Sequence, residues 1–385
     1  MIPYGKHYID KEDIKSVVKV LKSKNLTQGP VVKKFENSIC KYVGSKYAVA
    51  VSSCTAGLHL AAIVAKKLKK GSLLTSPISF VSTANSSIFT GGKTIFADIE
   101  QDTANISIQE IKKILKKEMV GSISPVHFGG LPSNMKAIKK INSKSKAIIY
   151  EDAAHAFGAK YDKKNMVGCC KYSDMTVFSF HPVKSIAMGE GGCITTNNKE
   201  IYKKLINLRS HGIEKNPKFF IDKKQKKNNQ WYYEMQDLGY HYRVTDMQCA
   251  LGLSQLKKIN IFLNKRRQIA KIYDFYFKNL KNAYPLHFEK RKYSSNHLYI
   301  LLIDFKKINK NRSQLMSEFK KAGIITQVHY IPITKHPFYK TKLNQKKIFK
   351  NTDDYYNKAL SIPIYYTLKS KEQNYVIKIV KKLIG

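Results

Sequence analysis

The sequence has no apolar run of about 18 residues, the length that a membrane-spanning helix needs, so we expect no membrane association. Its first residues, Met1 to His7, contain no apolar signal core, which favours a cytoplasmic location. Cysteine is sparse, and the six cysteines show neither a Cys-x-x-Cys pair nor regular spacing. We therefore expect reduced, mostly buried thiols, with no disulfide framework and no metal site.

Arginine is scarce as well, because only six of the 69 basic residues are arginine, although the formal net charge is +42. Base readout in nucleic acids prefers arginine, and the sequence has no helix-turn-helix, zinc-finger or RNP pattern. A lysine-rich coding bias explains the charge better than a nucleic-acid partner does. A lysine-rich polyanion-binding protein stays open as an alternative of a different class.

What is present is typical of a globular chain. The 385 residues are 43% hydrophobic and 11% aromatic, enough for a full core and two domains. In the first half, short apolar runs alternate with helical patterns, which favours an α/β fold with a mainly parallel sheet covered on both faces. Strands are predicted at 47–52, 73–77, 94–98, 121–126, 147–152, 175–180 and 193–196, and helices at 31–43, 108–115, 135–141 and 201–208.

The second half follows a different pattern. We expect an N-terminal arm over 1–13, a large domain over 14–255 and a smaller C-terminal α+β domain over 256–385. No Gly-x-Gly-x-x-Gly follows a strand, which disfavours a Rossmann dehydrogenase. In this half, helices are predicted at 245–261, 266–280, 315–321 and 375–383, strands at 298–303 and 324–330, and a lysine-rich loop at 215–230.

Three segments carry chemical groups just after predicted strands, where parallel sheets collect their ligands. Hydroxyls at 52–55 open an apolar helix whose free N–H groups suit an anion, although an N-cap alone explains them equally well. Asp152 ends a buried strand. Lys184 follows another strand, in a turn of small and polar residues that closes with Gly-Glu-Gly-Gly at 189–192.

Taken singly, these residues have ordinary explanations: Lys184 as solvated surface, Asp152 as a strand-end cap and Ser179 as a satisfied core hydroxyl. Together they match the needs of pyridoxal phosphate, which are an anion site, a carboxylate for the pyridine nitrogen and a lysine for the aldehyde. Such a lysine is nucleophilic near neutral pH only when desolvation or nearby positive charge lowers its pKa. We therefore predict pyridoxal 5'-phosphate as the cofactor.

The chain resembles the sugar aminotransferases of the DegT/DnrJ/EryC1/StrS family, which are fold-type I pyridoxal phosphate enzymes. The resemblance covers nearly the whole chain, and segments 178–184, 295–299 and 327–332 look most like the members that act in pseudaminic acid synthesis. The other matching segments are 26–30, 152–158, 189–192, 209–212 and 239–243.

The resemblance implies a homodimer with shared active sites, L-glutamate as amino donor and a nucleotide-linked 4-keto-6-deoxy sugar as acceptor. UDP-2-acetamido-2,6-dideoxy-4-hexulose is the favoured acceptor, while perosamine, bacillosamine or aminoarabinose types stay open. The dehydratase branch of the family carries histidine in place of the lysine, so Lys184 argues against it.

Residue roles follow from the same resemblance. Lys184 would bind the cofactor covalently, Asp152 would contact its pyridine nitrogen, and His155 and Phe80 would lie on either side of the ring. Thr55, the Ser179 hydroxyl and the amides of Cys54 and Ala56 would hold the phosphate.

In the family, the Gly-Tyr-x-Tyr-Arg segment enters the neighbouring subunit's site with an asparagine at the position of His241, so His241 or Arg243 would reach the phosphate there. For the aromatic and histidine side chains of the substrate site, packing explains the pattern equally well. The substrate contacts would be Tyr4, Lys24, Asn25, Leu26, Thr27, Gln327, Val328, His329 and Tyr330.

Overall fold

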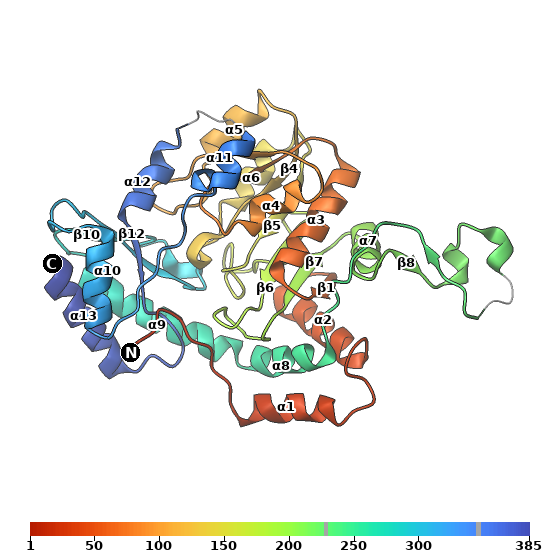
Figure 1. The fold of residues 1–385 in the computed structure, drawn as a ribbon, viewed down its shortest axis with the longest axis horizontal. Coiled ribbons are helices and arrows are strands. Elements are labelled where there is room, and N and C mark those ends of the chain that lie inside the picture. The colour runs from red at the N-terminus through yellow and green to blue at the C-terminus, as the bar shows by residue number, and fades with distance from the viewer. Residues whose placement is uncertain (227–229, 344–347) are drawn as a thin grey trace.

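A seven-stranded sheet forms the centre of the computed structural model, which describes residues 1–226, 230–343 and 348–385 (Figure 1). The strand order is β1-β7-β6-β5-β4-β2-β3. Every neighbouring pair is parallel except the two that β7 makes, with β1 and with β6. The prediction of a mainly parallel sheet is therefore confirmed. The strands are β1 Tyr47–Val51, β2 Ser72–Thr75, β3 Thr94–Phe96, β4 Val120–Ser124, β5 Ile148–Asp152, β6 Met175–Ser179 and β7 Gly192–Thr196.

Helices cover both faces of this sheet because its strands are apolar on both sides. In β1, Ala48 and Ala50 pack in the cluster that contains Phe35, whereas Val49 and Val51 pack in the opposite cluster with α3. Successive side chains of a strand point to opposite faces, so both layers are buried. The helices of this part are α1 Lys11–Leu21, α2 Pro30–Val43, α3 Cys54–Leu68, α4 Ser82–Ile88, α5 Ile108–Leu115, α6 Met135–Ile141, α7 Lys199–Arg209 and α8 Asp246–Lys257.

The C-terminal part is built on a three-stranded antiparallel sheet of β10 Ala283–Pro285, β11 Tyr299–Ile303 and β12 Ala359–Ile362. Its core is a separate hydrophobic cluster that includes Tyr273 and Phe319. The predicted domain boundaries, after residue 13 and after residue 255, stay predictions. Helix α1 begins at Lys11, inside the predicted N-terminal arm. The remaining helices are α9 Ile259–Phe277, α10 Arg312–Lys321, α11 Pro337–Leu343, α12 Lys350–Lys358 and α13 Ser370–Ile384.

The strand predicted at 324–330 is wrong. Among the residues that the structure describes, this segment makes only single bridges, Ile324 with Ile2 and Gln327 with Ser361. The side chains of residues 327–330 border a cavity instead. The predicted loop at 215–230 lies beyond a short hairpin, β8 Ile213–Glu214 with β9 Glu234–Met235, that projects from the body (Figure 1), and its residues 227–229 are outside the described part.

Two further findings concern membrane spans and disulfides. None of the helices in the described part is long and apolar enough to cross a membrane. The six cysteines are all free thiols.

Candidate active site

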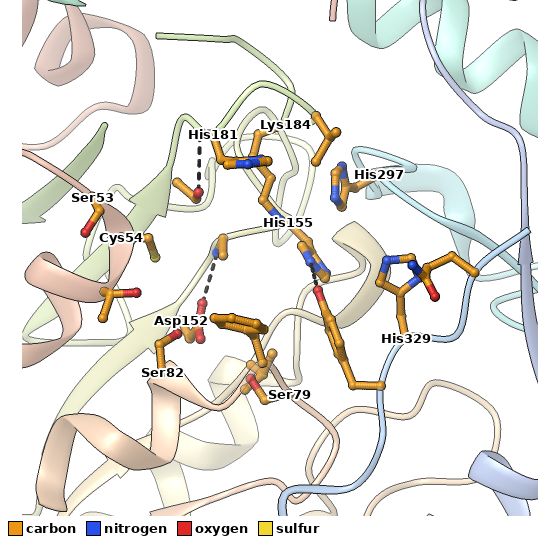
Figure 2. A pocket seen from close by; sticks show the side chains of 18 of the residues that line it. Ser53, Cys54, Ser79, Ser82, Asp152, His155, His181, Lys184, His297 and His329 are labelled. Carbon is orange, nitrogen blue, oxygen red and sulfur yellow. Dashed lines mark hydrogen bonds between the residues drawn. The ribbon is translucent and has the colours of Figure 1, made fainter. Parts of the chain in front are cut away.

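A cavity of about 530 Å³ opens at the carboxyl ends of the parallel strands (Figure 2). Its walls come from the segments that follow β1, β2, β4, β5 and β6, from segment 327–330 and from the N-terminal segment. Twelve predicted site residues line it, so the fold brings together positions that are far apart in the sequence. They are Tyr4, Cys54, Thr55, Phe80, Asp152, His155, Ser179, Lys184, Gln327, Val328, His329 and Tyr330.

Lys184 is presented by a tight loop between β6 and β7. The Lys184 amide donates to the His181 carbonyl at 2.9 Å, and the Met188 amide donates to the Phe180 carbonyl at 2.9 Å. Gly189 completes the loop with a φ of +76°, a conformation that suits glycine. The Lys184 side chain points into the cavity (Figure 2).

Burial lowers the pKa of Lys184 to about 8, while the Asp152 carboxylate opposes this change and the Arg266 guanidinium adds to it. A lysine with such a pKa has a useful uncharged fraction near neutral pH, because the uncharged amine is the nucleophile. Lys184 is therefore desolvated in the way that a nucleophilic lysine requires.

Asp152 ends β5 on the other side of the cavity (Figure 2) and is 4% exposed. Its Oδ1 accepts from the Ala154 amide at 3.1 Å, and its Oδ2 accepts from Thr83 Oγ1 at 2.5 Å. Burial raises the pKa of the Asp152 carboxyl, and these two donors and the Lys184 charge oppose that rise. A cation in the cavity would stabilise the ionised carboxylate further.

The N-terminus of α3 borders the cavity through Ser53, Cys54 and Thr55. Ser53 caps the helix, because its Oγ accepts from the Ala56 amide at 3.1 Å. Gly192 at the start of β7 lies against this end, where a Cβ would stand 2.7 Å from the Cys54 nitrogen. The close approach requires glycine, and the helix end it supports is suited to an anion.

An aromatic wall faces these polar groups. Phe80 is 57% exposed, so its ring offers a bare apolar face to the cavity, and its centroid lies 6.2 Å from that of Tyr330. The Tyr330 hydroxyl hydrogen-bonds to His155 Nε2 at 2.9 Å. His155 Nδ1 is buried without a hydrogen-bond partner among the described residues, so it is available to a ligand.

These observations test whether pyridoxal phosphate fits. The helix end and Ser179 suit its phosphate, the bare Phe80 ring suits its planar ring, and the orphaned His155 Nδ1 suits a polar ring substituent. Asp152 and Lys184 supply the carboxylate and the amine. The residues fit the group, and the fold and site define a fold-type I transferase.

Seven predicted residues do not line this cavity. The Ala56 amide already donates to Ser53, so a phosphate role for it needs the cap to open. Residues 24–27 are exposed between α1 and α2, where the Leu26 carbonyl accepts from the Asp246 amide. His241 is exposed, and Arg243 lines a separate cavity of about 330 Å³ beside α2 and α7. Within one chain, Lys24, Asn25, Leu26, Thr27, His241 and Arg243 therefore stay outside the site.

Sequence reasoning missed several lining residues. Ser53 lies in the hydroxyl-rich segment 52–55, and His181 and His297 lie in segments 178–184 and 295–299, which resemble the family. Their position in these segments was a signal that they line the site. Thr83, which holds Asp152, had no sequence signal. The additional lining residues are Ser53, Ser79, Ser82, Val126, Ala154, His181, Val183, Glu190 and His297.

The chain belongs to the DegT/DnrJ/EryC1/StrS aminotransferase family, whose model matches residues 7–381. It is 38% identical over 380 residues to the UDP-4-amino-4,6-dideoxy-N-acetyl-beta-L-altrosamine transaminase of Campylobacter jejuni, covering 98% of this chain and 96% of that protein. It is 36% identical to the spore coat polysaccharide biosynthesis protein SpsC of Bacillus subtilis over 100% and 97% of the two chains.

Among solved structures, the chain is similar to Helicobacter pylori PseC, described as an aminotransferase involved in the biosynthesis of pseudoaminic acid. The TM-score is 0.90 at 32% identity, with 100% of this chain and 99% of that chain covered. The fold and family predicted from the sequence are confirmed.

Proposed function

We propose that this chain is a pyridoxal-phosphate-dependent aminotransferase that moves the amine of L-glutamate to the C4 carbonyl of a nucleotide-linked 4-keto-6-deoxy sugar. The acceptor that we favour is UDP-2-acetamido-2,6-dideoxy-4-hexulose, in pseudaminic acid or related surface-sugar synthesis. The single observation that carries the proposal is the placement of Lys184 and Asp152 on opposite walls of one cavity. The similarity to the Campylobacter jejuni transaminase supports the choice of sugar.

Bound pyridoxal phosphate would supply a carbonyl carbon for amine exchange and a ring that withdraws electrons during proton transfer. Lys184 Nζ would accept the proton from the α-carbon of glutamate and, in the second half of the cycle, deliver a proton to C4 of the sugar. Its pKa of about 8 suits both directions, because proton transfer is most effective when the pKa is near the working pH.

The other lining residues would bind and orient. Asp152 would stabilise a protonated ring nitrogen, and Thr83 would fix the direction of that carboxylate. Thr55, Ser179 and the Cys54 amide would hold the phosphate at the α3 end, and Phe80 and His155 would border the ring. Tyr4 and segment 327–330 would form the wall that meets the sugar nucleotide.

We further propose a cytoplasmic homodimer with shared active sites. Residues 24–27, His241 and Arg243 lie outside the cavity of their own chain, which supports their assignment to a neighbouring subunit's site. The free state of all six cysteines supports a reducing compartment.

The test is a panel of UDP-, GDP- and dTDP-linked 4-ketosugars incubated with the protein, pyridoxal phosphate and glutamate, with the amino sugar detected by mass spectrometry. We expect turnover with the UDP-linked acceptor, loss of at least about 10³-fold in Lys184→Ala, and normal turnover in Lys203→Ala, an exposed lysine of α7. Retained turnover in Lys184→Ala, or no amino sugar from any acceptor, would contradict the proposal.

The second candidate is the same reaction on another nucleotide sugar, such as a perosamine, bacillosamine or aminoarabinose type. It is favoured by the similarity to SpsC, which extends over the whole chain at nearly the same identity. Amination of a GDP- or dTDP-linked acceptor alone selects the second candidate, and among UDP-linked acceptors the two candidates are separated by which sugar stereoisomer is aminated. The polyanion-binding alternative is set aside, because the chain belongs to an enzyme family.

A further inference from the structure

A second, small cavity of about 20 Å³ lies next to the active site. Among the described residues, Lys184 alone lines both the large cavity and the small one. The small cavity is also lined by Arg266, which comes from α9. Lys184 and Arg266 therefore border the same small cavity.

Arg266 is 3% exposed, which is costly for a permanent charge. Its Nη1 donates to the carbonyls of His297 at 3.2 Å and Ile364 at 2.8 Å. Both partners are neutral, and no ion pair joins Arg266 to a carboxylate within 1–226, 230–343 and 348–385. Burial lowers the pKa of Arg266 to about 10, so it stays cationic at neutral pH with its charge uncompensated.

The other groups around Lys184 do not duplicate this charge. Burial keeps the Cys54 thiol protonated by raising its pKa, and it lowers the pKa of His297 and other histidines of the site, so these groups are neutral near pH 7. Asp152 is the facing anion, and the exposed Glu190 follows in the loop. The histidines of the site whose pKa is lowered are His155, His181, His297 and His329. Two residues of the N-terminal segment, Lys6 and His7, also border the small cavity, but both are exposed.

We propose that Arg266 is a positioning residue for Lys184: its buried, carbonyl-held guanidinium fixes a positive charge at the small cavity that both residues line, and this charge adds to burial in favouring the uncharged form of the lysine amine. This role would explain why a costly unpaired charge is retained at this point of α9. The inference rests on the proposed function for its purpose, because an uncharged Lys184 is what binds an aldehyde and accepts a proton.

The two carbonyls that hold Arg266 come from the C-terminal part of the chain. His297 precedes β11 and Ile364 follows β12, so the two carbonyls that hold Arg266 both belong to that part of the chain. The Arg266 guanidinium is therefore held by two carbonyls of the C-terminal part.

The test measures the protonation of Lys184 directly, in the full-length chain freed of cofactor. Acetic anhydride in trace amount modifies only uncharged amines, and mass spectrometry of the peptide with Lys184 gives the rate at each pH. We expect a midpoint near 8 in the wild type and a higher midpoint in Arg266→Gln, because the substitution removes a positive charge that opposes protonation of Lys184. Arg267→Gln is the matched control, because this neighbour contacts Asn264 at the surface.

Circular dichroism and thermal unfolding establish that each variant is folded, and Arg266→Met replaces Arg266→Gln if the latter is not. A wild-type midpoint near the ordinary value of about 10.4 overturns the inference without any variant. A folded, neutral variant with the wild-type midpoint overturns it as well, and leaves Arg266 a structural role only. The measurement needs no sugar and no turnover, so failure of the acceptor panel would contradict the proposed function without affecting this result.

Discussion

Thr83 Oγ1 donates a 2.5 Å hydrogen bond to Oδ2 of Asp152, and Ser79 Oγ lies 2.6 Å from the same threonine oxygen. A chain of hydroxyls from the segment after β2 therefore fixes the carboxylate at the end of β5. This contact joins two strands that are not neighbours in the sheet, and it points the acid at the cavity.

Asp152→Asn should abolish turnover without destabilising the cofactor-free protein. Burial raises the pKa of Asp152, so the folded state binds its proton more tightly than the unfolded state does, and ionisation at neutral pH costs stability. A neutral asparagine removes that cost. Urea unfolding at pH 7.5 should show an equal or higher midpoint than the wild type, and a clearly lower midpoint would contradict the argument.

Tyr330→Phe should weaken pyridoxal phosphate binding about tenfold, which corresponds to the loss of one buried hydrogen bond. The change removes the hydroxyl partner of His155 Nε2 and leaves both nitrogens of that ring without a partner. An absorbance titration of the cofactor measures the effect. Tyr276→Phe, at an exposed position of α9, is the control and should bind as the wild type does.

Gly192→Ala should destabilise the protein by about 1–3 kcal/mol and impair cofactor binding, because the added methyl group would meet the backbone of Ser53 and Cys54 at 2.7 Å. Thermal unfolding measures the stability. Gly5→Ala is the matched control, since the nearest atom to its Cβ would be 3.8 Å away. Equal melting temperatures of the two variants would show that the α3 end tolerates the methyl group.

His287→Gln should make the protein less sensitive to acid. Burial lowers the pKa of His287 to about 3, below the unfolded value of about 6.5, so the unfolded state binds more protons between these values. Stability is thus lost as the pH falls from 6.5 toward 3. Urea unfolding gives the free energy of unfolding at pH 7.5 and at pH 5. Between these two pH values, His287→Gln should lose about 2 kcal/mol less of this free energy than the wild type does. The exposed His7→Gln should lose as much as the wild type.

The sequence predicts the sheet and the reactive groups well because both leave local signals. The helices at 108–115 and 135–141 have the predicted bounds, and the strand that ends at Asp152 was found because an apolar run stops at a charge. Lys184 was identified by its small and polar neighbours. These features depend on residues that are close in the sequence.

What the sequence could not give depends on tertiary contact. Segment 327–330 has the composition of a strand, yet it meets β12 only through the bridge between Gln327 and Ser361, and its side chains line the cavity. The residues around Thr83 and Arg266 do not indicate the roles of these two side chains. Thr83 acts on Asp152 and Arg266 acts on Lys184, each about 70 or more positions away in the sequence. Strands β10 and β12 are not predicted from the sequence, and both are defined by their pairing with β11.

The single-bridge attachment of segment 327–330 has an evolutionary consequence. The segment is held by side chains, with His329 Nδ1 2.8 Å from Ser361 Oγ and the Tyr355 hydroxyl donating to the His329 carbonyl, rather than by a strand ladder. Substitutions there can reshape the wall for a new acceptor while the lysine and aspartate, on the central sheet, stay where they are. One scaffold can in this way diversify its sugar without rebuilding its chemistry.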